Sequence, residues 1–566
     1  MEKIIEHRKP IYIGCIIVFS LFFLSFILTS GYWSDDFRLW FLKGIFKADN
    51  KTIFDTIHDK ITWHISMGRI FPVTSIVSEN LVYLLPLKLY KGYLILITIL
   101  CELSCFRAIY KISANEDFAF LSTISSVILF CIIPDYVHSV FLCFGGNSIL
   151  SLTLCFLALG SWVDWLRKGQ TKYEIIFLVL FALSLLTYEV AYTFIIVYFL
   201  IAAIEKRNIR AIIKAIWKTA VIFLLVFSLY SYVKIFLTTN IYAGNSLSIN
   251  LKQNLRGFFV SITSALPFFS WFVRGGVEKS LQGFTANLSI SLILKWLLLI
   301  GLFVSVMILN YKSTKKNNSK RKSNICSSEV LLIALTCILF PACLMAVSEK
   351  YQTLDWGKGY IVIIYQYFGL GILFASIFYG SVKRFSKYKR IWYAVLLVYG
   401  ICIITVNQNN SYYNITAMEE SGHNGVLTAD YVDLVESFSK SDILHQLSEN
   451  GDLVCSNKRS QYSLLTFSNY DIQCVDTYSE TSHTIEKIRL FNEFIIVGET
   501  GNKKSKLVEN PLIYYSSKMA GKQIRLKTSD GTILKITLEN TSAAEKGYCI
   551  TRLEGITAFI DTPKTL

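Results

Sequence analysis

The chain has 566 residues, of which 53% are hydrophobic, 14% aromatic and only 17% charged. Soluble globular proteins carry about 25% charged residues, so this composition excludes an ordinary soluble protein over most of the length. The apolar residues also form long blocks, such as Ile11–Leu28 and Leu292–Leu309. Crossing about 30 Å of hydrocarbon takes about 20 apolar residues, so these blocks predict membrane-spanning helices.

The net charge of +16 is distributed unevenly along the chain. Residues 407–566 carry 16 Lys and Arg against 20 Asp and Glu, whereas residues 1–406 carry 40 against 20. The positive excess lies in short loops at alternate ends of the apolar blocks, as the positive-inside rule describes for membrane proteins. We therefore expect the lipid bilayer, and no nucleic acid, among the partners.

Basic Lys3, Arg8 and Lys9 place the N-terminus in the cytoplasm and start a count of about eleven transmembrane helices. Nine of these are predicted directly from apolar blocks, at about 11–30, 91–110, 118–134, 147–165, 217–236, 290–311, 329–347, 361–380 and 391–406. An odd number of spans leaves the rest of the chain outside. The sequence thus predicts a multi-pass protein of the plasma membrane.

The apolar block 174–204 needs a separate decision, because it is too long for one upright helix and short for two. Basic residues flank it on both sides, and a single span would place one basic cluster outside. Two short helices that turn at Thr187-Tyr188-Glu189 keep both clusters inside. We predict this helical hairpin, with Glu189 at its outer end; one tilted helix is the alternative.

The chain changes character after Val406, where residues 407–566 have an ordinary soluble composition. Apolar and polar residues alternate in period two on both sides of Ser529-Asp530-Gly531, which predicts a β-hairpin. Residues 432–446 predict a helix. The sequence indicates two domains, a transmembrane domain over 1–406 and a C-terminal extracytoplasmic α+β domain over 407–566.

The candidate chemistry begins directly after the first span, at Trp33-Ser34-Asp35-Asp36-Phe37. Two adjacent carboxylates follow an apolar slab there, and partial burial raises the pKa of a carboxylate toward that of a useful general base. The alternative is a helix start, since Ser, Asp and Asn are good N-cap residues. One segment can serve both purposes.

An acidic residue in the first outer loop resembles the mark of the GT-C superfamily of polytopic glycosyltransferases. The later segment Trp63-His64-Ile65-Ser66-Met67-Gly68-Arg69 is similar to the Gly-Arg that follows in bacterial members, which include O-antigen-modifying and wall-polysaccharide glycosyltransferases. The resemblance covers the 406-residue membrane part, with its two long outer loops and odd number of spans. The C-terminal domain adds no recognisable motif.

The resemblance implies a hexosyltransferase whose donor is a polyprenyl-phosphate-linked sugar and whose acceptor is a cell-surface glycan such as a wall polysaccharide. An acidic residue of the first loop deprotonates an acceptor hydroxyl, which attacks the anomeric carbon and releases polyprenyl phosphate. By that template Asp36 is favoured as the catalytic base and Asp35 as an orienting residue, although the sequence barely separates them. The sequence specifies no cofactor and leaves a divalent cation, Mg²⁺ or Mn²⁺, open.

Cations on the outer side are needed to bind the donor phosphate. Arg69 is one candidate, because a guanidinium binds phosphate oxygens in pairs. Lys350 and Lys358 are two more, in an outer loop whose Tyr351 and Trp356 offer ring faces to a sugar. The alternative is an aromatic belt with lysines reaching the lipid headgroups, and a headgroup-binding Arg69.

Three further residues are candidates for substrate binding. Asp135 and His138 follow the third span, where the alternative is a solvated turn after Pro134. Glu189 lies within an apolar block, and ionisable residues there are usually functional. We expect Glu189 either to bind acceptor or to pair with Arg69; a purely structural pair at the hairpin turn is the alternative.

Two other classes of protein would share this topology. A flippase or transporter for lipid-linked sugars would show internal repeats and charges deep within its spans. The sequence shows no internal repeat, and its charges concentrate at the outer rims of the spans and not deep within them. A polysaccharide polymerase also handles polyprenyl-linked sugars outside, but it is usually marked by Arg-rich outer loops and not by an acidic first loop.

Overall fold

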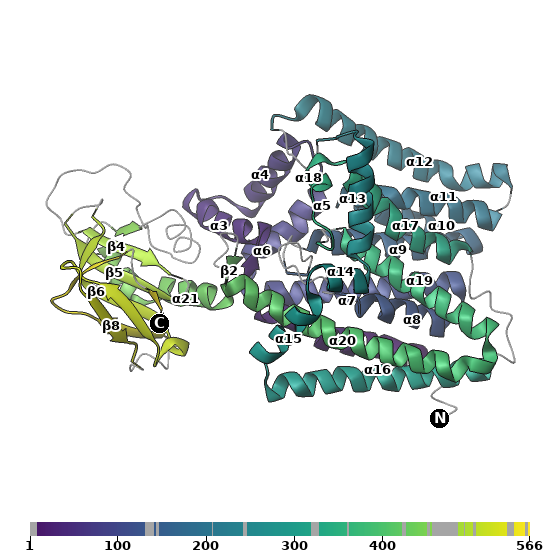
Figure 1. Ribbon diagram of the computed structural model, residues 1–566. Helices are drawn as coiled ribbons and strands as arrows, with labels where there is room; N and C mark the ends of the chain where they lie inside the picture. The colour runs from purple at the N-terminus through teal and green to yellow at the C-terminus, as the bar shows by residue number, and fades with distance from the viewer. Residues whose placement is uncertain are drawn as a thin grey trace. The chain divides into compact units, whose positions relative to one another are not determined.

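The computed structural model describes fourteen stretches of the chain, namely residues 8–130, 141–142, 146–206, 208–240, 246–317, 328–358, 362–420, 426–449, 453–455, 485–491, 493–501, 505–539, 548–560 and 564–565. The chain forms two compact units (Figure 1). The membrane unit comprises Met1–Thr29, Ile57–Asn80 and Lys88–Gly422. The C-terminal unit comprises Ser30–Thr56, Leu81–Leu87 and His423–Leu566.

Eight helices of the described chain are long and apolar enough to cross a membrane, so the protein is a multi-pass membrane protein. Each coincides with one predicted span, which confirms the polytopic helical fold. These helices are Arg8–Thr29 (α2, Arg8–Phe23, with the 3-10 segment η1, Leu24–Thr29), Leu87–Ser113 (α7), Asn147–Lys168 (α9), Ile209–Leu237 (α12, Ile209–Tyr232, with the π segment η5, Val233–Leu237), Ile290–Thr314 (in α16, Ile290–Asn317), Ser328–Val347 (α17), Ile363–Arg384 (α19) and Ser386–Ala417 (η7, Ser386–Tyr388, and most of α20, Lys389–Glu420).

The third predicted span begins as the shorter helix α8, Glu116–Val127. Its N-terminus is capped by Asn115, whose side-chain oxygen accepts a hydrogen bond from the backbone N–H of Phe118 at 3.0 Å. Residues 131–140, which include the far end of the predicted span, lie outside the described residues.

The block 174–204 forms two helices, α10 (Thr171–Leu185) and α11 (Phe194–Lys206), joined through the 3-10 segment η4, Glu189–Thr193. The Tyr198 ring of α11 lies 5.0 Å from the Phe177 ring and 5.2 Å from the Phe181 ring of α10. The two helices therefore fold back on each other, and the predicted hairpin is observed with Glu189 at its turn.

Ion pairs gather the basic loops at one end of the membrane unit. Arg167, in the last turn of α9, pairs with Glu205 of α11, their closest atoms 2.6 Å apart. Lys218 of α12 pairs with Glu174 of α10 at 2.7 Å. Lys111 of α7 pairs with Asp164 of α9. Both basic flanks of the hairpin therefore lie at the same end, as the hairpin prediction required.

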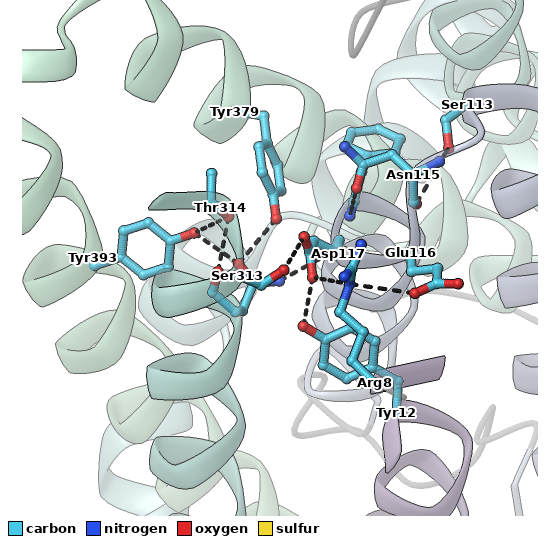
Figure 2. A network of polar contacts seen from close by, with 12 residues as sticks. Arg8, Tyr12, Ser113, Asn115, Glu116, Asp117, Ser313, Thr314, Tyr379 and Tyr393 are labelled. Carbon is cyan, nitrogen blue, oxygen red and sulfur yellow. Dashed lines mark hydrogen bonds and ion pairs between the residues drawn. The ribbon is translucent and has the colours of Figure 1, made fainter. Parts of the chain in front are cut away.

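A buried polar network near the N-terminus of α2 links five helices, α2, α8, α16, α19 and α20; Figure 2 shows its centre. The Asp117 carboxylate of α8 accepts hydrogen bonds from the hydroxyls of Tyr12 in α2 and Ser313 in α16, both at 2.7 Å. Arg8 pairs with the same carboxylate at 3.2 Å. One carboxylate of α8 thus contacts α2 and α16 through two hydrogen bonds and one ion pair, which take the place of water.

Asn310 of α16 extends the network into α19 and α20, whose Tyr379 and Tyr393 are labelled in Figure 2. Its side-chain N–H donates to the backbone carbonyl of Asp117 at 3.0 Å. Its side-chain oxygen accepts hydrogen bonds from the hydroxyls of Tyr379 at 2.9 Å and Tyr393 at 2.7 Å. Because these partners are spread widely along the sequence, the network can form only when all five helices have packed.

Helix α20 continues well beyond Val406, so the domain boundary predicted at residue 407 falls within a helix. The polar residues that suggested solvent are buried donors and acceptors. Asn407 donates to the carbonyl of Ile128, and Gln408 donates to the carbonyl of Phe23 at 2.8 Å. Asn410 accepts from the hydroxyl of Ser280 at 2.5 Å. These amides bind α20 to other helices of the membrane unit.

The two long loops that the sequence analysis places outside are largely helical. The first contains α3 (Asp35–Ala48), α4 (Ile53–Ser66), α5 (Pro72–Thr74), the π-helical segment η2 (Ser75–Glu79) and α6 (Asn80–Leu84). The second contains α13 (Leu251–Ser264), α14 (Pro267–Val273) and α15 (Gly276–Ala286), and the short helix α18 (Glu349–Gln352) follows α17.

The C-terminal domain is α+β, as predicted. Its strands are β2 (Val426–Leu427), β3 (Leu453–Cys455), β4 (Ile485–Leu490), β5 (Phe494–Thr500), β6 (Leu507–Ser516), β7 (Gln523–Lys527), β8 (Ile533–Thr537), β9 (Tyr548–Arg552), β10 (Thr557–Phe559) and β11 (Lys564–Thr565). One sheet has the order β10-β6-β5-β4-β3, with β9 also on β6; another has the order β11-β7-β8. The β7–β8 pair is the predicted hairpin.

Apolar side chains of both sheets form one core. Period-two alternation directs Ile513 and Tyr515 of β6 into this core together with Ile524 and Leu526 of β7. Tyr514 lies on the opposite face of β6, where its ring meets that of Phe438 at 5.0 Å. The helix predicted over 432–446 is observed as two helices, α21 (Ala429–Ser439) and α22 (Asp442–Glu449).

Replacing Asp117 tests the polar network. Asp117→Ala removes the acceptor of Tyr12 and Ser313 and leaves the mostly buried Arg8 without this ionic partner, which costs about 3–5 kcal/mol for a buried pair. We expect a lower midpoint of thermal unfolding in detergent. Lys168→Ala is the control, because its i,i+4 pair with Asp164 is half-exposed and worth about 0.3–0.5 kcal/mol. Equal midpoints for the two variants would contradict a stabilising role.

Candidate functional site

The acidic pair lies in the C-terminal unit, at the start of α3. The strand β1 (Tyr32–Trp33) precedes it and pairs antiparallel with β2. Ser34 then adopts a left-handed conformation, with φ of +52°, and α3 begins at Asp35. A left-handed non-glycine residue is strained, and such strain is common at functional sites. The segment is therefore a helix start, as the alternative interpretation held.

The structure separates the two carboxylates that the sequence barely distinguished. Asp36 is fully buried, whereas Asp35 is exposed. The reason is helical geometry, because adjacent residues of a helix point about 100° apart and only one can face the interior. Asp36 therefore has the protein-lined environment expected of a general base, and Asp35 faces outward.

Sequence reasoning missed two groups around Asp36. Burial raises the pKa of the Tyr32 phenol well above its ordinary value, and the charges of Glu436 and Asp36 raise it further. Tyr32 is thus close enough to both carboxylates to feel their fields. Glu436 is a half-buried residue of α21, about 400 positions away in the chain, so no local pattern could have associated it with Asp36.

Arg69 of the membrane unit is placed by the way α4 ends. Gly68 has a φ of +74°, and its N–H donates to the carbonyl of Ile65 at 2.9 Å. The N–H of Arg69 donates to the carbonyl of His64, also at 2.9 Å. These two bonds form a Schellman motif, in which glycine supplies the left-handed residue. The Gly-Arg pair is therefore a helix stop that presents the next side chain.

The structure brings Arg69 and Glu189 together. The Arg69 Nε and Nη2 atoms donate to the two carboxylate oxygens of Glu189, each at 3.0 Å. This is the paired geometry that makes Arg–carboxylate contacts strong and directional. The guanidinium lies 4.3 Å from the Phe71 ring centroid and 6.0 Å from that of Tyr188. Glu189 is thus a partner of Arg69, and this contact fits both the expected pairing with Arg69 and the alternative of a purely structural pair at the hairpin turn.

The hairpin turn also bonds directly to the first loop. The hydroxyl of Thr74 donates to the carbonyl of Thr187 at 2.7 Å, and the N–H of Val73 donates to that of Leu186 at 3.4 Å. Both side chains of the Arg69–Glu189 pair retain about one-fifth of their exposure. The pair is therefore held in place from both elements but still reaches the surface.

A buried charge cluster beside Arg69 was not predicted. The His64 Nε2 atom lies 2.9 Å from Glu79 Oε1, and both side chains are over 90% buried, as is Lys60. Burial by itself would raise the pKa of the Glu79 carboxyl, but His64 and Lys60 hold it below its ordinary value. The π-helical turn of η2 places Glu79 here, and its irregular period hid it from sequence reasoning.

The second long loop packs onto the segment after α17. The Arg256 guanidinium donates to the carbonyl of Gln352 at 2.5 Å. The Gln352 side chain donates to the carbonyls of Ser248 and Ala346, both at 3.0 Å. The backbone of Thr239 and Asn240 in turn donates to the carbonyl of Ser66, at the end of α4. The loop 239–286 therefore connects the end of α4 with residues 346–352.

The candidate residues of that segment lie at its surface. Lys350 is exposed and its ammonium is 5.5 Å from the centroid of the Tyr351 ring. Trp356 keeps 39% of its exposure and lies 6.0 Å from the Phe269 ring of α14. Lys358 is half-buried. These four residues share one short stretch of the membrane unit, and both the phosphate-binding and the aromatic-belt interpretations fit this placement.

Lys91, near the start of α7, is a further cation that sequence reasoning missed. It is fully buried, and its ammonium donates to the carbonyl of Leu142 at 3.2 Å. A buried ammonium is costly unless it has a partner or a ligand.

The candidates Asp135 and His138 lie outside the described residues.

An apolar cavity of about 540 Å³ opens on the membrane unit. It is lined by Trp271 of α14 and by seven residues of α20 between Ile391 and Ile403. Its lining suits a hydrocarbon chain.

The described residues contain no group of three or more His, Cys, Asp or Glu side chains that could hold a metal ion. Asp36 and Glu436, the two carboxylates around Tyr32, fall short of the usual number of protein ligands for a dedicated site.

Comparisons with known proteins found partial likenesses only among solved structures. No protein-family profile matches the chain, and no curated protein matches it by sequence. An oligosaccharyltransferase from Archaeoglobus fulgidus in complex with Zn and sulfate matches over 82% of this chain and 58% of its own, at 13% identity and a TM-score of 0.36. This chain thus spans less than two thirds of that protein's length.

Two further structures are of oligosaccharyltransferases from the same organism, Archaeoglobus fulgidus. The apo form matches over 93% of this chain and 74% of its own, at 10% identity and a TM-score of 0.37. Oligosaccharyltransferase AglB in complex with an inhibitory peptide and a dolichol-phosphate matches over 99% and 76%, again at 10% identity and 0.37.

Replacing Gly68 tests the helix stop that presents Arg69. Gly68→Ala places a Cβ on a left-handed residue, which costs about 1–2 kcal/mol. We expect a lower thermal midpoint in detergent than for Gly14→Ala, since Gly14 is an open position within α2. Gly169→Ala is a matched control with φ of +68° at the end of α9, and its loss should be similar. An unchanged midpoint for Gly68→Ala would contradict the Schellman assignment.

A double-mutant cycle tests the Arg69–Glu189 pair. Arg69→Gln, Glu189→Gln and the double variant should show a coupling energy of about 1.5–3 kcal/mol, as for hydrogen bonds between charged groups. The measurement is the free energy of unfolding of the full chain in detergent. The pair Lys522–Glu493, at 3.8 Å and largely exposed, serves as the control and should couple by less than about 1 kcal/mol. Coupling no larger than the control would show that the pair is not formed.

Proposed function

We propose that this chain is a membrane glycosyltransferase that moves a sugar from a polyprenyl-phosphate donor to a glycan acceptor on the outer face of the membrane. The observation that carries the proposal is the complete burial of Asp36 one short strand beyond the first span. A carboxylate removed from water is a stronger proton acceptor, and positioned general bases typically contribute about 10²–10⁴ in rate.

In the proposed reaction Asp36 accepts the proton of an acceptor hydroxyl. The hydroxyl oxygen attacks the anomeric carbon of the donor sugar, a new glycosidic bond forms, and the bond to the phosphate oxygen breaks. The electron pair leaves with polyprenyl phosphate. The exposed Asp35 is proposed to orient the acceptor, and Tyr32 and Glu436 to shape the environment of the base.

The membrane unit is proposed to hold the donor. Arg69 binds phosphate oxygen while Glu189 fixes the guanidinium plane, and Lys350 and Lys358 add positive charge. The exposed face of Trp356, with Tyr351, is proposed to stack on a sugar ring. The apolar cavity along α20 has the chemistry for the isoprenoid chain. Asp135 and His138 stay candidates for acceptor binding.

The orientation follows the positive-inside rule. The basic ends of α7, α9 and α11, gathered by ion pairs, are proposed to face the cytoplasm. The acidic pair and the C-terminal domain then face outward. The proposed acceptor is a wall or surface polysaccharide of a bacterium, so the sugar composition of that polysaccharide reports the activity.

Asparagine substitutions test the roles of the acidic pair. In a strain that lacks the chain, complementation with Asp36→Asn should lower transfer by about 10²–10⁴, because the amide is not a base. Asp35→Asn should cause a smaller loss. We expect the surface glycan to lack a side-branch sugar while the polyprenyl-phosphate sugar accumulates. Asp49→Asn, in the exposed end of the same segment, is the control and should restore the glycan.

The same strains separate the proposal from its rivals. Full restoration by Asp36→Asn would remove the acidic pair from the mechanism. An unchanged glycan with altered movement of a lipid-linked sugar across the membrane would favour a flippase. Shortened polysaccharide chains with intact branches would favour a polymerase.

A further inference from the structure

The ladder of β1 and β2 joins two parts of the chain that are far apart in sequence. Tyr32 lies opposite Leu427, and Trp33 lies opposite Val426. The first strand immediately precedes the acidic pair, and the second opens the C-terminal domain. All of these residues belong to the C-terminal unit.

The two strands approach so closely at Gly31 that no side chain fits there. A Cβ built on Gly31 would overlap the carbonyl oxygen of Leu427 and would also lie 2.7 Å from the carbonyl carbon of Thr428. Both obstacles are backbone atoms, which cannot rotate away as a flexible side chain can. Only glycine therefore lets β1 lie this close to β2.

After the ladder, the chain continues from β2 into the folded C-terminal domain. Thr428 follows it directly and caps α21, accepting at its hydroxyl a hydrogen bond from the N–H of Tyr431 at 3.1 Å. α21 packs on the sheet through Phe438 and Tyr514. Lys518, just after β6, pairs with Asp430 at 2.5 Å. The position of β2 is therefore fixed by the β-sheet domain.

The other strand of the ladder, β1, ends two residues before α3 begins. The Tyr32 ring stacks on that of Trp40 in α3, with centroids 5.9 Å apart. Tyr32 and Trp33 are buried, and the strained Ser34 alone separates the strand from Asp35. A displacement of β1 therefore moves the first turn of α3, and with it Asp36.

We infer that the C-terminal domain is the positioning element of the acidic pair, acting through β2 on β1. Gly31, Leu427 and Thr428 are then positioning residues, which set the place of Asp36 without touching substrate. This inference rests on the proposed function, because it is Asp36 that gives the position its importance. It assigns the C-terminal domain a part in catalysis that a separable accessory domain would not have.

The test compares Gly31→Ala with Gly14→Ala in the purified full-length chain, assayed in detergent with a short-chain polyprenyl-phosphate sugar. Misplacing a catalytic group by about 1 Å can cost about 10²-fold in rate. We expect Gly31→Ala to lower kcat by about 10–10²-fold and to leave the donor KM within about twofold. Hydrogen exchange should rise in peptides that cover β1 and β2. Gly14→Ala should change none of these, since its Cβ meets nothing within 4 Å.

A milder pair of variants covers the case in which Gly31→Ala does not fold. Thr428→Ala removes the cap of α21, and Asn208→Ala removes the cap of α12 in the membrane unit. Each costs about 1 kcal/mol of stability. Only Thr428→Ala should lower kcat and raise exchange in β1. Equal kcat losses for the two caps, or an unchanged kcat with raised exchange in β1, would overturn the inference.

The outcome is distinguishable from failure of the proposed function. If Asp36→Asn retains full transfer, the proposed base is wrong whatever the Gly31 variant does. If Asp36→Asn loses transfer and Gly31→Ala keeps both kcat and the exchange of β1, the base stands and the positioning role is wrong.

Discussion

A hydrocarbon slab offers no hydrogen bonds, so polar groups within the membrane unit must find their partners in the protein. The Asp117 carboxylate shows how this constraint organises the bundle. Its oxygens, with the carbonyl of the same residue, engage α2 and α16, and Asn310 extends the contacts to α19 and α20. The same rule explains the polar stripe of α20, where Asn407 and Gln408 donate to carbonyls of other helices.

The end of the membrane unit that carries Arg69 uses the same chemistry to hold charged side chains in defined places. A Schellman stop presents Arg69, a bidentate contact with Glu189 fixes its plane, and the Phe71 ring supports it. His64, which contacts Glu79, lies in the last turn of α4, just before this helix stop. Such arrangements fix a cation without removing it from the surface, which is what recognition of an anionic headgroup or phosphate needs.

The proposed groups are divided between the two compact units. Asp36, with Tyr32 and Glu436, belongs to the C-terminal unit, whereas Arg69, Glu189 and residues 350–358 belong to the membrane unit. The first long loop contributes to both, since residues 30–56 and 57–80 are assigned to different units. The loop thus belongs to the C-terminal unit at its beginning and at its end, residues 81–87, and to the membrane unit in between.

Much of this protein was readable from its sequence, because hydrophobic length and basic flanks act locally. Apolar blocks predicted the spans, the charges around 174–204 predicted a hairpin that turns at Glu189, and period-two alternation predicted the β7–β8 hairpin. Other features depend on partners far away in the chain. Asn407 appeared to begin a soluble domain, but it is buried because carbonyls of other helices accept its hydrogen bonds.

The acidic pair shows the same division most clearly. The sequence placed two carboxylates after the first span but hardly distinguished them, since both have the same local context. Tertiary structure decided that Asp36 is buried and Asp35 exposed, and it brought Glu436 and β2 to this segment from about 400 residues away. Burial and strand pairing are set by packing between distant segments, and no local pattern of residues encodes them.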